Sequence, residues 1–165
     1  MSKGIKRHPC LQPLSRDHLI ALMGAQRLIK ASTGEITLEE GLEYFLRIFK
    51  EEVNQHLIDE EAILPEFIKD KKDLERLLSD HKKLRSYVEK LKVDNQNKTL
   101  FSEAGNFLDA HVRWEEREFF PRIEKTSTKE EIEKLLELTD QVEKKRSRNK
   151  SCQTRKKAKK NNAPG

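Results

Sequence analysis

Residues 74–91 read LERLLSDHKKLRSYVEKL, and their apolar side chains recur every three or four residues. This is the period of an α-helix, so the segment predicts an amphipathic helix with one face directed at a core. His81 falls on that apolar face between Leu77 and Leu84, at a position where the pattern calls for a core residue. An imidazole buried among leucines needs partners for its ring nitrogens, which makes His81 a candidate functional residue.

Three other segments carry the same helical pattern, and each also places one histidine on its apolar face. They run from Ser15 to about Gly34, from Thr37 to about Pro65, and from Leu100 to the region of Pro121, with His18, His56 and His111 as their histidines. Thr37 and Glu40 form a capping box, which predicts the start of the second helix. Four amphipathic helices with short connections predict an all-α, up-down-up-down four-helix bundle.

The composition changes toward the C-terminus. Ser127 and Glu130 form another capping box, which predicts a short extra helix after the bundle. Residues 144–165 then contain ten Lys or Arg and no Asp or Glu, while the net charge of the whole chain is +5. Because this segment has almost no apolar side chains to bury, we expect a bundle domain at residues 1–143 and a disordered basic tail at residues 144–165.

The two cysteines and the hydropathy pattern bear on the compartment. Cys10 and Cys152 are isolated and form no CxxC pair, so they predict neither a disulfide framework nor a thiolate metal site. No apolar run is long enough to span a bilayer, and no signal-peptide pattern opens the chain. We therefore expect no transmembrane segment and a cytoplasmic location.

Two glutamates share a predicted helix face with a histidine. Glu60 follows His56 by four residues, and Glu115 follows His111 by four. This spacing lets one helix offer a nitrogen and an oxygen to the same centre, although a single such match is common in a chain so rich in Glu. The stretches HLIDEEAILP (56–65) and HVRWEEREFFP (111–121) also share the longer pattern H-x-x-x-E-E followed by proline, which strengthens the signal.

Six side chains are therefore candidate ligands of one metal centre: His18, His56, Glu60, His81, His111 and Glu115. Imidazole and carboxylate without thiolate suit iron, manganese or zinc. A zinc site uses four ligands, so six donors, two of them carboxylates able to bridge, favour a dinuclear centre. The ferritin-like plan places Glu-x-x-His on its helices, and this chain has the reverse order and a different spacing.

The order His18, His56-x-x-x-Glu60, His81, His111-x-x-x-Glu115 resembles the hemerythrin-like, HHE-type cation-binding domain, as do the flanking stretches SRDHLIAL and HVRWEEREFFPRIE. The resemblance covers about residues 8–125. It implies a non-haem di-iron centre in which the four histidines bind two Fe ions and Glu60 and Glu115 bridge them. We therefore expect a protein that binds or senses a small diatomic ligand, oxygen or nitric oxide, or a related redox signal.

One position departs from the oxygen-carrying members of that family, which have a second histidine four residues from the first on the third helix. Here those positions are Leu77 and Arg85. Glu52, one turn before His56, is a candidate to complete the site, and the alternative is that it hydrogen-bonds a ligand histidine. His8 lies outside the predicted helices, and we expect it to be exposed to solvent.

We expect binding or sensing rather than catalysis, because no separate general acid or base accompanies the candidate ligands. Three alternatives stay open: a di-iron oxidase or peroxidase, an iron storage or delivery protein, and a nucleic-acid-associated protein in which the bundle is a regulatory module. The basic tail has two interpretations: a solvating extension, which is the commoner case, or an anchor that makes weak, nonspecific contact with nucleic acid or an anionic surface. It has no interleaved aromatic residues for base stacking.

Overall fold

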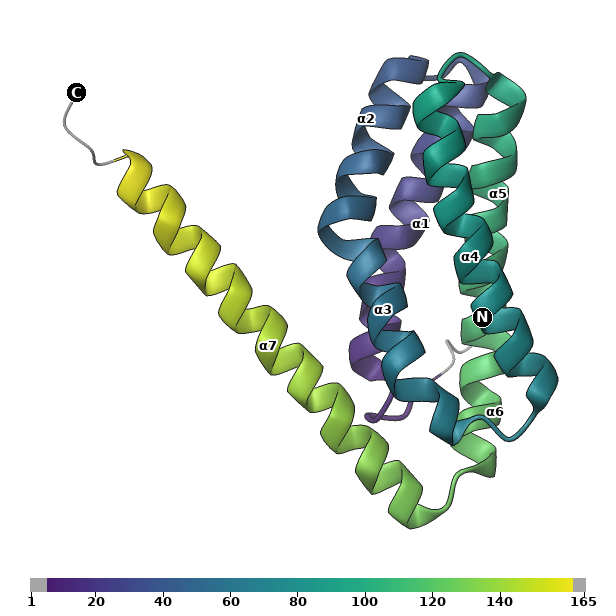
Figure 1. The fold of residues 1–165 in the computed structure, drawn as a ribbon, viewed down its shortest axis with the longest axis vertical. Coiled ribbons are helices and arrows are strands. Elements are labelled where there is room, and N and C mark those ends of the chain that lie inside the picture. The colour runs from purple at the N-terminus through teal and green to yellow at the C-terminus, as the bar shows by residue number, and fades with distance from the viewer. Residues whose placement is uncertain (1–5, 162–165) are drawn as a thin grey trace.

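The helices before residue 127 are arranged as four rods. Figure 1 shows the rods lying side by side, with the C-terminal helix leaving the bundle at an angle. This computed structural model describes residues 6–161, and within that range it contains helices and turns but no strand. No helix of the described part combines the length and the apolar character needed to cross a membrane. The predicted all-α four-helix bundle is confirmed.

The rods follow one another along the chain. The first rod is α1 (Gln12–Thr33). The second consists of α2 (Leu38–Ile48), the π-helical η1 (Phe49–Val53), α3 (Asn54–Ile63) and the 3-10 helix η2 (Leu64–Phe67). The third is α4 (Lys71–Val93). The fourth consists of α5 (Lys98–Trp114), the π-helical η3 (Glu115–Phe119) and α6 (Phe120–Thr126), and α7 (Lys129–Asn161) follows it.

The helix starts agree only in part with the sequence. Thr37 caps α2 as predicted, since its hydroxyl accepts a hydrogen bond of 3.0 Å from the backbone N–H of Glu40. The first helix begins at Gln12, before the predicted N-cap at Ser15. The Ser15 hydroxyl instead donates to the carboxylate of Glu116 on the fourth rod. A residue predicted as a cap therefore contributes to a contact between rods.

Two of the four rods contain one π-helical turn each, η1 and η3. A π turn holds one extra residue, so it changes which face of the helix the following side chains occupy. Pro121 lies in the first turn of α6, directly after η3, where a missing backbone N–H is tolerated. The fourth rod therefore continues past Pro121, where the sequence predicts its end, to Thr126.

Two apolar clusters fill the bundle, one on each side of a central polar layer. The first contains residues such as Ala21, Leu57, Leu84, Leu108 and Phe101, and the second contains Leu14, Ile63, Leu77, Trp114 and Phe120. Each rod thus passes from one apolar cluster to the other. The six candidate metal ligands lie where the rods pass from one cluster to the other, with apolar side chains on both sides that exclude water.

Helix α7 begins with the predicted type of cap, displaced by one residue. The capping box joins Thr128 and Glu131 rather than Ser127 and Glu130. The Glu131 side chain accepts from the Thr128 N–H at 3.0 Å, and the Thr128 hydroxyl accepts from the Glu131 N–H at 3.2 Å. Leu135 is fully buried in the second apolar cluster, so the first part of α7 belongs to the core.

The extent of α7 differs from the expected short helix and disordered tail. The helix continues to Asn161, well past Lys144, where the apolar pattern ends. Residues 129–161 contain no proline or glycine, and they are rich in Lys, Arg and Glu, which favour helix, so no residue there terminates it. Figure 1 shows this later part running away from the bundle. Residues 162–165, the end of the predicted tail, lie outside the described residues.

Candidate metal centre

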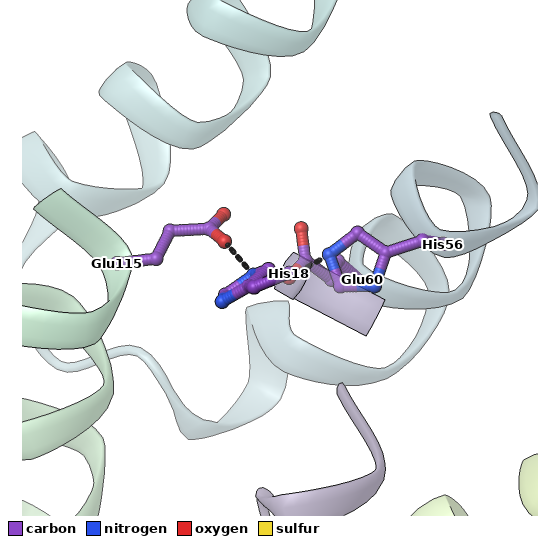
Figure 2. A group of neighbouring side chains, drawn as sticks. All are labelled: His18, His56, Glu60 and Glu115. Carbon is purple, nitrogen blue, oxygen red and sulfur yellow. Dashed lines mark ion pairs between the residues drawn. The ribbon is translucent and has the colours of Figure 1, made fainter. Parts of the chain in front are cut away.

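The six candidate ligands converge midway along the bundle. His18 comes from α1, His56 and Glu60 from α3, His81 from α4, His111 from α5, and Glu115 from the first residue of η3. All are buried, with at most 4% of their surface exposed. We call these six residues the central cluster. Figure 2 shows four of them, His18, His56, Glu60 and Glu115, with their polar ends directed at one another.

The ligand atoms of the central cluster form two groups, and within each group they lie no more than 4.8 Å apart. The first group is His18, His56, Glu60 and Glu115, and the second is His81, His111, Glu60 and Glu115. The histidines divide between the groups, two to each, whereas both glutamates belong to both. Such sharing is the arrangement needed for two ions bridged by two carboxylates.

The two oxygens of each shared carboxylate face different groups. Glu60 Oε1 lies 2.8 Å from His56 Nε2, and Glu60 Oε2 lies 3.1 Å from His81 Nε2. Likewise, Glu115 Oε2 lies 2.7 Å from His18 Nε2, and Glu115 Oε1 lies 2.9 Å from His111 Nε2. Each glutamate is therefore oriented to give one oxygen to each of two adjacent cations.

Most inward-facing atoms of the central cluster are buried without a hydrogen-bond partner in the described part of the chain. They are Nε2 of His18, His81 and His111 and both oxygens of Glu60 and Glu115. Short nitrogen–oxygen contacts join them, but these contacts lack the angles of a hydrogen bond. A buried polar atom left unpaired costs about 1–3 kcal/mol. Two cations would pair all of these atoms, so the donor set fits a dinuclear metal centre.

Each histidine of the central cluster turns its other ring nitrogen, Nδ1, to a second carboxylate. The distances are 2.6 Å for His18–Glu116, 2.9 Å for His56–Asp17, 2.9 Å for His81–Glu61 and 3.0 Å for His111–Asp80. We call Asp17, Glu61, Asp80 and Glu116 the outer carboxylates. A carboxylate on Nδ1 fixes the orientation and tautomer of the ring, and it directs Nε2 toward a metal.

Sequence reasoning missed the outer carboxylates, although the sequence contains a signal for them. Asp17 and Asp80 directly precede His18 and His81. Glu61 and Glu116 are the second glutamates of the two H-x-x-x-E-E stretches. Both halves of the bundle therefore carry Asp-His followed by His-x-x-x-Glu-Glu. The repeated pattern therefore contains both the central cluster and the outer carboxylates.

Burial and neighbouring charge shift the pKa values of the central-cluster side chains in opposite directions. Burial disfavours the protonated form of His81, but Glu115 and Glu60 outweigh it and raise its pKa to about 9. Burial also disfavours protonated His111, and Glu115 with Asp80 raises its pKa to about 10. Burial disfavours the charged form of Glu115, but the adjacent histidines hold its pKa well below the usual range. A metal ion must therefore displace protons from these imidazoles.

Other residues singled out in the sequence lie elsewhere. Glu52 is half-buried on η1 and belongs to neither group of the central cluster. Leu77 is fully buried in the second apolar cluster. Arg85 donates to Glu61 Oε1 at 2.7 Å and thus contacts an outer carboxylate. His8 is exposed, as expected.

In the comparison with protein-family models, residues 14–123 match the hemerythrin HHE cation binding domain. Neither the comparison with curated proteins nor that with solved structures found a match to the chain. The matched range holds all six residues of the central cluster and all four rods of the bundle except the start of α1 and the end of α6. The chain therefore belongs to the hemerythrin family of cation-binding domains.

Proposed function

We propose that this protein is a non-haem di-iron protein and that the central cluster supplies the ligands. His18 and His56 bind one iron, His81 and His111 bind the other, and Glu60 and Glu115 bridge them. The observation that supports this assignment most directly is the sharing of both glutamates between the two groups, with one carboxylate oxygen facing each group.

We propose further that the centre binds or senses a small diatomic molecule, oxygen or nitric oxide. Two imidazoles and two carboxylate oxygens give each iron four protein donors, and non-haem iron sites of this kind keep positions open for an external ligand. The central cluster is buried between two apolar clusters, which favours a ligand of only a few atoms. A buried apolar surround also limits the access of water to the metals.

The test is metal analysis of the purified protein together with its visible spectrum before and after exposure to oxygen and to nitric oxide. We expect about two iron ions per chain, following the two groups of ligand atoms, and a spectral change with at least one of the gases. Iron content near one or zero after anaerobic loading would contradict the di-iron assignment. An unchanged spectrum with both gases would contradict the ligand-binding role.

Binding is favoured over an oxidase or peroxidase and over an iron storage or delivery protein. The four outer carboxylates all hold histidine Nδ1 atoms, so none of them is placed as a separate proton donor for catalysis. Steady turnover of peroxide by the iron-loaded protein would favour the enzyme. Reversible loss of iron without unfolding would favour storage or delivery.

We also propose that the basic end of α7 contacts a polyanion, for which duplex nucleic acid is the probe. Residues 144–165 hold ten Lys or Arg and no acidic residue, and α7 runs away from the bundle (Figure 1). Nonspecific binding of this kind weakens steeply with salt. The full chain should bind duplex DNA at low salt, and a chain ending at Ser147 should not. Equal binding by both chains, or by neither, would contradict this proposal.

We propose the cytoplasm as the location. Cys10 is a free, buried thiol, and Cys152 has no cysteine near it in the sequence. A free thiol such as that of Cys10 suits a reducing compartment, and cell fractionation tests the assignment.

A further inference from the structure

Four arginines surround the outer carboxylates, one arginine to each carboxylate. The pairs are Arg7–Glu116 at 2.9 Å, Arg85–Glu61 at 2.7 Å, Arg76–Asp80 at 3.5 Å, and Arg146–Asp17. Every histidine of the central cluster therefore contacts a carboxylate that in turn contacts the guanidinium of an arginine. A residue that acts on an outer carboxylate can affect the metal only through the histidine that this carboxylate holds.

The arginines that serve the two groups of the central cluster come from different parts of the chain. His81 and His111 are connected through their outer carboxylates to Arg85 and Arg76, which both belong to α4 inside the bundle. His18 and His56 are connected in the same way to Arg7, which precedes α1, and to Arg146, which lies on α7. Both of the latter fall outside the family match over residues 14–123. In the part of the terminal segments that the structure describes, the arginines that contact outer carboxylates thus serve one of the two groups.

Arg146 joins three helices at this half of the centre. Its guanidinium pairs with Asp17 on α1 through Nη1 and with Asp59 on α3 through Nη2. The Asp17 oxygen that Arg146 contacts, Oδ2, is also the atom that lies 2.9 Å from His56 Nδ1. The Arg146 side chain is 24% exposed, compared with 47% for Arg76 in the other half. Because the less exposed pair is screened less by water, Arg146 holds its carboxylate more firmly.

We propose that Arg146 is a positioning residue for the iron between His18 and His56, so that α7 sets the stability of one iron position and not of the other. Arg146 keeps Asp17 turned inward, and Asp17 in turn fixes the imidazole of His56. Without Arg146, Asp17 is free to turn toward solvent, and His56 loses the partner that orients it. The inference rests on the proposed di-iron function, and it adds a difference between two positions whose protein ligands are equivalent.

The test uses the full-length protein loaded anaerobically with ⁵⁷Fe(II), with Arg146→Gln compared against wild type. One reading is the rate at which a ferrous chelator removes each of the two ions, and the other is the Mössbauer spectrum. We expect one ion to leave about tenfold faster in the variant, the lower end of the effect of residues that support metal ligands. The Mössbauer parameters should change for half of the iron and stay at wild-type values for the rest. Arg146→Lys, which keeps the charge, should restore part of the difference.

Two comparisons separate positioning from simple docking of α7. Arg16 pairs with Glu143 and joins the same two helices, α1 and α7, but it contacts no outer carboxylate. Arg16→Gln should therefore leave both release rates at wild-type values. In an Asp17→Asn background, Arg146→Gln should have little further effect on release, because the link from Arg146 to His56 is already broken.

Equal acceleration of both ions by Arg146→Gln would overturn the proposal, and so would unchanged release or an equal effect of Arg16→Gln. Each of these results would show that α7 supports the fold but not one iron position. Failure of the wild-type protein to hold two ions would instead contradict the proposed function, so the two ideas fail in different measurements.

Discussion

Glu60 and Glu115 approach each other from α3 and η3, and each turns one carboxylate oxygen toward each pair of histidines. Neither side chain exposes any surface. Two buried carboxylates this close oppose each other's ionisation, and the four histidines around them offset that repulsion. Because each glutamate serves both groups, its loss should affect two metal ions, whereas the loss of one histidine should affect mainly one.

We expect Glu115→Gln to weaken binding of both irons by at least about tenfold, since even residues that only support a ligand contribute this much. Iron per chain after desalting, measured by elemental analysis, checks the prediction. Glu118→Gln is the matched control, because Glu118 lies on the same π turn and is exposed. His18→Gln should lower the content toward one ion. Retention of two irons by Glu115→Gln would show that this carboxylate does not bridge.

The stability of the iron-free protein should fall with rising pH. The folded state raises the pKa of His81 from 6.5 to about 9 and that of His111 from 6.5 to about 10. A raised histidine pKa stabilises the fold fully below pH 6.5, and this contribution disappears as the pH rises through 9 and 10. Melting temperatures from pH 6 upward should therefore decrease by several degrees, at about 2–4 °C per kcal/mol for a chain of this size.

The comparison for this pH series is the double variant His81→Gln, His111→Gln, which should show a flatter profile because both groups are gone. Iron affinity should have the opposite dependence and rise with pH, since binding displaces the histidine protons. A wild-type melting temperature that stays constant or rises between pH 6 and pH 9 in the absence of iron would contradict the pKa assignment.

The reduced, iron-loaded protein should be oxidised rapidly by oxygen, and degassing should not restore it. Oxygen-carrying family members have a second histidine four residues from the first on the third helix, and the two positions four residues from His81 here are Leu77, which is fully buried, and Arg85, which pairs with Glu61. A coordination position that no histidine fills would let oxygen reach the iron directly and take up its electrons. Stopped-flow mixing followed by degassing measures both steps. Leu77→His should slow the oxidation, and full recovery of the wild-type protein over several cycles would mean that another residue closes the site.

Replacing Leu135 of α7 with alanine should destabilise the whole domain, while the same change at its neighbour Leu136 should not. Leu135 is fully buried beside Phe119 and Ile123 in the second apolar cluster, and Leu136 is 41% exposed. Leu135→Ala should cost about 2–5 kcal/mol of unfolding free energy, as for other buried leucines, and Leu136→Ala much less. Urea denaturation of the two variants measures the difference. Equal stabilities would mean that α7 does not pack on the bundle in solution.

The bundle and the central cluster could be predicted from the sequence because both follow from the helical period. A histidine such as His81 on an apolar stripe must meet other buried polar groups, and the four-residue spacing of His56 and Glu60 fixes their common face. Local rules of this kind also predicted the cap at Thr37. These features depend only on residues one or two turns apart.

The contacts of the outer carboxylates with histidines and arginines could not be predicted in the same way, since they depend on which helix faces meet. The contact of Asp17 with Arg146 joins residues 129 positions apart, and although Asp17 belongs to the repeated Asp-His pattern, Arg146 belongs to no pattern in the sequence. The π turn at Glu115 has no signature in the apolar pattern, because one extra residue shifts the period only locally. The full length of α7 was missed because the apolar pattern used to find helices stops before the helix does.

The repeated Asp-His and His-x-x-x-Glu-Glu pattern has a consequence for how such a centre can change during evolution. Residues 17–61 and 80–116 each form a helical hairpin with half of the ligands, and two identical hairpins related by a two-fold axis could build the same centre. In such a dimer, every substitution would appear in both halves at once. Joining the hairpins in one chain removes that constraint, and it allows Arg7 and Arg146 to support one half alone.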